Sequence, residues 1–464
     1  MDTRQSSRVA RVFRHPPRAV LFFAFAFAVM ADPVSSVAYA IEAALRALNG
    51  HLDLLLPTMG IVIGIIALIT ANYWQLVRAF PRGGGSPQAA GRAFGEAWSF
   101  LPIGALIVDF ALTIAISIAA AASSVIDYLP ALAPARIPLA LTLVAVVAAM
   151  TWFGHGGRLV FALMTCLFIV AAIAVLAFGW TSPHLAHGAA PITGAASPAL
   201  VAVIFAFPVA MALATGTEAP ATSIAQLGQL DDRGRNRFGR GTLALTVVIV
   251  GTLTMGLTAL AVHLHVGIPG PDETQIGDLA EAAAGRGGLF AFFQLSSGLL
   301  LLAAASSSFQ AGPGLLKALA STGHNGVQGL LPARLAKVNR HHTPVAAVVV
   351  YTVISAAIVL AAGAQEQELV LVYAVAVFVS FLAGLLAMAR FSHRQGSHAM
   401  TAMNLVGAAT VIFTLAVNLA RGYPLLAIGG TVLIATGLHW RWVRAGRPRG
   451  IEEVEQRAES EVDA

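Results

Sequence analysis

Apolar stretches long enough to cross a bilayer recur along the whole chain, separated by short polar loops. A membrane-spanning helix needs roughly 20 mostly apolar residues, because each residue adds about 1.5 Å. The pattern therefore predicts an all-α integral membrane protein with twelve transmembrane helices. We place them at residues 19–47, 53–80, 97–123, 137–153, 158–180, 197–228, 242–266, 286–316, 343–363, 367–389, 400–420 and 423–440.

Two of these predicted helices are interrupted by polar residues and helix breakers at mid-depth. In the first, thirteen apolar residues (19–31) are followed by Asp32, Pro33, Ser35 and Ser36. Proline removes a backbone hydrogen bond, and an ionised carboxylate in the bilayer costs about 3 kcal/mol on the mildest insertion scale. The break is either a proline kink beside a protonated Asp32 or part of a polar site, and a second break favours the site.

The sixth predicted helix is interrupted in the same way between residues 214 and 220, by polar residues, a carboxylate and helix breakers, with a break at Gly216 beside Glu218. Because the two broken helices are five spans apart, they cross the membrane in opposite directions. This is typical of transporters with two inverted five-helix repeats. We assign the repeats to 19–180 and 197–391 within a transporter domain at 19–444, with two additional helices at 400–440. A short helix is predicted over the outer mouth within residues 269–288.

The composition agrees with an integral membrane protein, and the distribution of charge predicts its orientation in the membrane. Hydrophobic residues make up 57% of the 464 residues and charged residues 11%. With a cytoplasmic N-terminus, 24 of the 28 Lys and Arg residues lie on the cytoplasmic side, where such residues accumulate. The four predicted to lie outside are Arg46, Arg136, Arg286 and Arg421. We therefore expect both termini in the cytoplasm, a protein of the cell membrane, and no nucleic-acid partner. Residues 1–18 form an N-terminal segment and residues 445–464 a short tail, of which we predict residues 452–464 to be disordered because they are charged.

Three carboxylates lie at mid-depth in the predicted helices, and every Lys and Arg lies in a loop or at a helix end. These carboxylates are Asp32, Asp109 and Glu218. Without a basic partner, such groups are either protonated or matched by a mobile cation. The pattern predicts a secondary transporter of cations that is coupled to protons, with Glu218 and Asp109 as the candidates for carrying the proton.

Each carboxylate shares a helix face with a hydroxyl group. Tyr39 is seven residues after Asp32, Thr113 is four after Asp109, and Thr215 is three before Glu218. Alkali cations prefer oxygen ligands, and the backbone unwound at Pro33 and Gly216 is expected to add carbonyls. We expect no enzymatic activity and no cofactor apart from the transported ions. Two histidine pairs, His263 with His265 and His341 with His342, are interpreted as solvated rather than metal-binding.

An amino-acid or amine permease of the same fold is the alternative function. A transporter of free amino acids usually receives the substrate carboxylate on the bare amides of a glycine-rich turn in its first helix. Here that place holds Asp32 and Pro33, a negative charge and a residue without an amide hydrogen. A channel or a sensor is a third and weaker alternative.

Four short stretches, residues 32–40, 80–85, 106–113 and 215–219, resemble the KimA-type potassium importers of the amino acid–polyamine–organocation superfamily. The resemblance implies a LeuT-type fold and proton-coupled potassium uptake. It also implies a set of potassium-binding residues, which are Asp32, Tyr39, Asp109, Thr113, Thr215, Glu218 and Tyr373.

The chain also departs from that family at named positions. Pro33 replaces a small residue, Phe110 replaces a tyrosine, and the cytoplasmic C-terminal domain of those importers has no counterpart here. We therefore do not expect the regulation by a cyclic dinucleotide that acts through that domain. A homodimer follows from the resemblance alone.

Overall fold

The computed structural model describes residues 18–153, 158–184, 198–321, 329–422 and 425–460. The predicted N-terminal segment, apart from Arg18, and the last four residues of the tail lie outside this part of the chain. Within the described ranges the fold is entirely helical, with one isolated bridge between Val338 and Pro344.

Helices occupy all twelve predicted ranges. The first range holds three short helices, α2 (Arg18–Val29), α3 (Ala31–Ser35) and α4 (Val37–Ala47). The sixth holds α10 (Ala199–Ala210), η3 (Met211–Ala214), α11 (Ala219–Thr222) and η4 (Ser223–Gln226). The other ten are α5 (Leu52–Ala79), α7 (Phe100–Tyr128), α8 (Arg136–Trp152), α9 (Arg158–Thr181), α12 (Asp232–Leu264), α14 (Gly288–Ala320), α15 (Val345–Ala361), α16 (Glu366–Arg394), α17 (His398–Ala420) and α18 (Leu425–Arg444).

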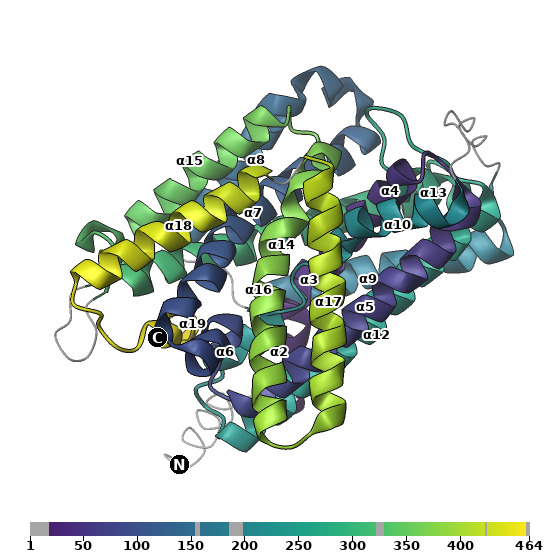
Figure 1. Cartoon of the computed structure of the whole chain (residues 1–464). Helices are drawn as coiled ribbons and strands as arrows, with labels where there is room; N and C mark the ends of the chain where they lie inside the picture. Colours follow the sequence, from purple (N-terminus) through teal and green to yellow (C-terminus); the bar gives the residue numbers. More distant parts are fainter. Residues whose placement is uncertain (1–17, 154–157, 185–197, 322–328, 423–424, 461–464) are drawn as a thin grey trace, which may run out of the picture.

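Nine helical segments in the described part of the chain are long and apolar enough to cross a membrane, and α2 and α15 are shorter apolar helices. The prediction of an all-α, multi-pass membrane protein is therefore confirmed. The core is built around α7, which packs against α14, α16 and α18 (Figure 1). Small residues such as Ala119–Ala122 on α7 and Ala303–Ala305 on α14 are buried, and such residues let membrane helices approach closely.

Short helices join the long ones. The bounds are α6 (Gly85–Phe94), η1 (Glu96–Ser99), η2 (Pro130–Ala135), α13 (Gln275–Ala284), η5 (Ala333–Ala336), η6 (Ile451–Glu453) and α19 (Val454–Ser460). Helix α13 confirms the helix predicted within residues 269–288. Helix α6 was not predicted, because its glycines and alanines give a weak periodic signal. It follows a turn in which Gly83, Gly84 and Gly85 adopt φ angles of 88°, 109° and 41°, a region open mainly to glycine.

The prediction that residues 452–464 are disordered was wrong for residues 452–460, which continue η6 and form α19. Ile451, Val454 and Ala458 are only 6%, 1% and 6% exposed, and they pack with Leu315 and Leu319 of α14. Their spacing of three and four residues places them on one helix face. The charged residues dominate the composition of this segment and conceal its apolar face.

Candidate functional site

The first helix break is a double interruption in which the backbone stays close to helical. The residues at the two interruptions, Met30 and Ser36, keep right-handed helical angles. Pro33 lies in the first turn of α3, where backbone N–H groups lack intrahelical acceptors and a missing donor costs little. The Ser35 hydroxyl donates to the Asp32 carbonyl at 2.7 Å. The predicted unwinding at Pro33 is therefore limited, and the Asp32 carbonyl already accepts a hydrogen bond.

The second break is a true unwinding. After η3, Thr215 is extended (φ −64°, ψ 145°) and Gly216 has φ +77°, before α11 begins at Ala219. The Thr215 and Thr217 hydroxyls donate to the carbonyls of Ala212 (2.8 Å) and Ala214 (2.7 Å). Each of these carbonyls also accepts the backbone N–H of the same threonine, at 3.3 Å, so side chain and backbone together fix the turn.

The two breaks touch each other. A β-carbon added to Gly216 would lie 2.8 Å from Asp32 Cγ and 2.8 Å from the backbone nitrogen of Pro33, so only glycine fits here. Ser36 also connects them, since its Oγ lies 3.0 Å from Tyr39 Oη and 2.9 Å from Thr215 Oγ1. The site thus joins segments that are 179 positions apart in the sequence.

Two of the long helices complete the site. Thr113 of α7 and Tyr373 of α16 are hydrogen-bonded through their hydroxyls at 2.8 Å. The Tyr373 side chain also interacts with that of Tyr39 on α4. Hydroxyl groups therefore run from the second break through Ser36 and the two tyrosines to α7.

The three carboxylates face the same region. Asp109 interacts electrostatically with both Glu218 and Asp32, and Glu218 interacts with Asp32. Asp109 is 3% and Glu218 7% exposed, and each of the three carboxylates has one buried oxygen without a hydrogen-bond partner. Among the described residues, no Lys, Arg or His forms an ion pair with any of them. Buried acceptors without partners are costly, so this cluster is suited to bind a cation or protons.

The structure brings all seven predicted residues together, from α3, α4, α7, the second break and α16. Ser36 was recognised in the sequence as a polar residue of the first break but was not among the predicted site residues, although it joins the two breaks. The sequence spacing could have indicated this role, because Ser36 is three residues before Tyr39 and therefore lies on the same helix face as this predicted site residue.

No group of three or more His, Cys, Asp or Glu residues in the described part of the chain is arranged to hold a metal. His263 instead stacks on Trp180, with ring centroids 4.5 Å apart.

The described residues thus form a multi-pass arrangement of apolar helices that encloses a polar site at two touching helix breaks. The model of the amino acid permease family matches residues 20–436, and the chain belongs to this family. Together with a sequence match to the potassium transporter KimA, this family match confirms the predicted similarity to the amino acid–polyamine–organocation superfamily and to the KimA-type importers.

Among curated proteins, the potassium transporter KimA of Bacillus subtilis (strain 168) is 28% identical over 361 residues. The match covers 75% of this chain and 58% of that protein, so the chain spans little more than half the length of its relative. Among solved structures, two mutants of the manganese transporter of Eremococcus coleocola match with a TM-score of 0.49 and 15% identity. These matches cover 92% of this chain and 95% of the other.

Proposed function

We propose that the protein is a secondary transporter that carries potassium, or a chemically similar alkali cation, into the cell together with protons. The observation that carries this proposal is the cluster of Asp32, Asp109 and Glu218, which lie close enough to interact and have no basic partner among the described residues. Three like charges in a buried site repel one another unless cations or protons compensate them. A site that exchanges a bound cation for protons couples the transport of the cation to the transport of protons.

The neighbouring donors suit a cation of this kind. The groups around the carboxylates are the hydroxyls of Tyr39, Thr113, Thr215 and Tyr373, all of which are oxygen ligands. Oxygen ligands suit alkali cations, whereas thiolate and imidazole ligands suit transition metals. The similarity to a potassium transporter supports potassium as the cargo.

A permease for amino acids or amines is the second candidate, because the matching family model carries that description. Asp32 could accept the ammonium group of such a substrate. The substrate carboxylate, however, would meet the negative charge of Asp32, and Pro33 offers no amide hydrogen to bind it.

The proposal includes the arrangement of the helices. Two inverted repeats of five helices, 19–180 and 197–391, would meet at the two breaks in a LeuT-type fold of twelve helices. Both termini would face the cytoplasm, and the outer end would carry α13. The contact between Gly216 and Pro33 supports this arrangement, since inverted repeats place their broken helices side by side at the midplane.

The Asp32→Asn variant tests the proposal, because it keeps the shape of the side chain and deletes its charge. Removing one partner of a buried charge pair costs about 3–5 kcal/mol, so apparent potassium affinity should fall at least about a hundredfold. The measurement is uptake of rubidium and of labelled amino acids by the wild type and the variant, at matched expression. Asp53→Asn, at an exposed carboxylate, is the control.

Saturable amino-acid uptake by the wild type without rubidium uptake would refute potassium as the substrate. The proton is tested in the same assay with Glu218→Gln, which imitates the protonated side chain. This variant should still bind rubidium but should no longer accumulate it in response to a proton gradient. Accumulation that keeps its normal dependence on pH would transfer the role to Asp109.

A further inference from the structure

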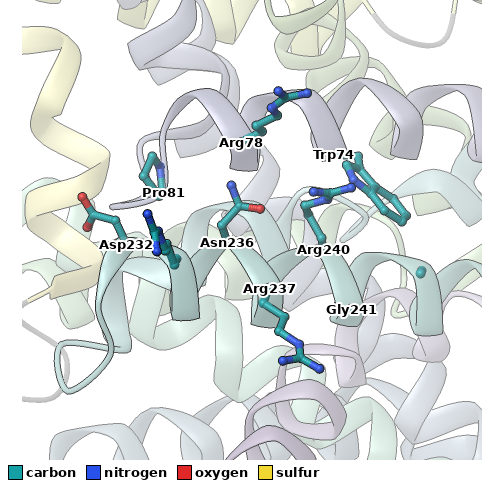
Figure 2. A pocket seen from close by; sticks show the side chains of 10 residues that line it. Trp74, Arg78, Pro81, Asp232, Asn236, Arg237, Arg240 and Gly241 are labelled. Carbon is teal, nitrogen blue, oxygen red and sulfur yellow. The ribbon is translucent and has the colours of Figure 1, made fainter.

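An arginine-rich cleft of about 670 Å³ lies between α5 and α12, at the end of the molecule where α12 begins. Figure 2 shows Trp74 and Arg240 meeting between these two helices, with Arg78 on α5 and Arg237 on α12. On α12, the lining residues Arg233, Arg237 and Arg240 follow one another at intervals of four and three residues. This spacing places the three residues along one stripe of α12, from which Arg240 extends toward Trp74 and Arg237 extends away from α5 (Figure 2).

The positive charge in the cleft is not compensated by the protein. Its one carboxylate, Asp232, is already paired with Arg82 at 3.3 Å and Arg235 at 3.8 Å. None of the four lining arginines forms an ion pair with a described residue. Four cations line the cleft beside a single shared carboxylate, and this excess of positive charge favours an anion.

Arg240 is held in place without a hydrogen-bond acceptor. Its guanidinium carbon lies 4.6 Å from the centre of the Trp74 ring, and its Nε is buried and has no hydrogen-bond partner. The aromatic face fixes the guanidinium, and no hydrogen bond to a described residue competes with a ligand for it.

The cleft continues into an apolar surface that faces the bilayer. Gly241 and Ala244 line it beyond the arginines, and Val248, one turn further on the same face of α12, is 61% exposed. A tryptophan beside arginines at the end of a membrane helix is typical of the interface between lipid headgroups and acyl chains. The ligand that fits has an anionic head and an apolar tail.

We propose that this cleft binds an anionic phospholipid, with its phosphate among the arginines and an acyl chain along Gly241, Ala244 and Val248. Guanidinium groups bind phosphate oxygens in pairs, which single ammonium groups cannot do. In the orientation proposed above, the lipid belongs to the inner leaflet. The site is separate from the proposed transport site and requires only that α5 and α12 cross the membrane.

The test measures lipid binding to the purified full chain in detergent, with phosphatidylglycerol, phosphatidylcholine and free glycerol phosphate as probes. We expect at least tenfold tighter binding of phosphatidylglycerol than of phosphatidylcholine, since each arginine near the surface contributes about five- to tenfold. Arg237→Gln combined with Arg240→Gln should abolish this preference, and exposed Arg78→Gln alone should reduce it. Arg444→Gln is the matched control, because Arg444 also lies over a tryptophan, 3.8 Å from the centre of the Trp440 ring, but lines no part of the cleft.

Three results would overturn the proposal. The first is equal affinity of the wild type for the two lipids, and the second is a preference that survives both cleft variants or is lost in the control. The third is glycerol phosphate binding as tightly as phosphatidylglycerol, which would identify a site for a free anion.

A second measurement locates the lipid. Phosphatidylglycerol with brominated acyl chains should quench the tryptophan fluorescence of the wild type, and Trp74→Phe should lose part of that quenching. Unchanged quenching in Trp74→Phe would place the lipid elsewhere.

Discussion

The Ser36 hydroxyl connects the first helix break to Thr215 of the second, at 2.9 Å, and also lies 3.0 Å from Tyr39 Oη. Ser36→Ala removes both contacts without adding volume. Two hydrogen bonds of about 1 kcal/mol each position these hydroxyls, so we expect the KM for rubidium to rise roughly tenfold or more.

Concentration-dependent uptake measures this effect, and Ser35→Ala is the control. Ser35 is the same type of residue at the neighbouring position, but its hydroxyl bonds to the carbonyl of Asp32 within α3. An equal loss in both variants would mean that Ser36 has no special part in the site.

At the residue scale, the charged residues of the site could be recognised in the sequence, whereas the contacts between site residues could not. A carboxylate or a proline inside an apolar stretch is conspicuous, because the bilayer makes either one costly, and so Asp32, Pro33 and Glu218 were found. Serine costs little in a membrane helix, so Ser36 was noted at the first break but was not predicted to be a site residue. The fit of Gly216 against Pro33 depends on a contact between distant segments, which no local pattern contains.

At the scale of elements, α13 is held by carboxylates from two membrane helices. Glu42 of α4 accepts from the backbone N–H of Gln275 at 3.1 Å, and Asp127 of α7 accepts from that of Thr274 at 3.1 Å. Both acceptors lie at the start of α13, where unsatisfied N–H groups and the helix dipole favour negative charge. This short helix is therefore tied to α4 and α7.

Asp278 of α13 makes this end of the molecule sensitive to pH. Burial, followed by the negative charges of Glu273 and Asp127, raises the pKa of Asp278 from 3.8 to about 8. The folded protein therefore keeps a proton that the unfolded chain releases, and stability falls as pH rises from about 4 to about 8. Asp278→Asn should remove this loss, so its advantage in thermal unfolding should grow with pH and level off above about 8.

Unfolding temperatures of the detergent-solubilised protein between pH 5 and pH 9 measure this difference. Asp53→Asn, on an exposed side chain, should follow the wild type. A gap between Asp278→Asn and the wild type that is constant across the range would exclude Asp278 as the titrating group.

The segment that contains η6 and α19 was not predicted to be helical from the sequence, yet it packs tightly against α6. A β-carbon on Gly91 of α6 would lie 2.6 Å from Glu452 Cβ and 2.4 Å from Ser99 Oγ. Gly91→Ala should therefore displace residues 451–460, and trypsin should cleave at Arg457 several times faster. Gly314→Ala on α14 is the matched control, because its β-carbon would meet only the Ala458 carbonyl, at 3.8 Å. Equal cleavage rates in the two variants would mean that this segment is not held against α6.

At the scale of the whole molecule, the long helices were predictable because a helix that crosses a bilayer needs a minimum apolar length. Each segment meets this requirement by its own sequence. The packing of α7 against α14, α16 and α18 could not be predicted, because it depends on which small residues of different helices contact one another. The same holds for α6 and α19, whose stability comes from docking and not from their own sequence pattern.

The orientation of the whole molecule can be tested from its charged ends. Arg46, Arg136 and Arg286, three of the four basic residues predicted to lie outside, all reach the segment 269–273 before α13, through Pro269, Asp272 and Glu273. The charge rule places this end outside and the arginine-rich end of α12 and α18 inside. In a chain whose single cysteine is replaced (Cys166→Ala), we expect Glu273→Cys to react with a membrane-impermeant maleimide on intact cells. Arg449→Cys should react only after the cells are permeabilised. Both positions are exposed, so a reversed pattern would reflect orientation and not access, and it would invert the direction of transport proposed here.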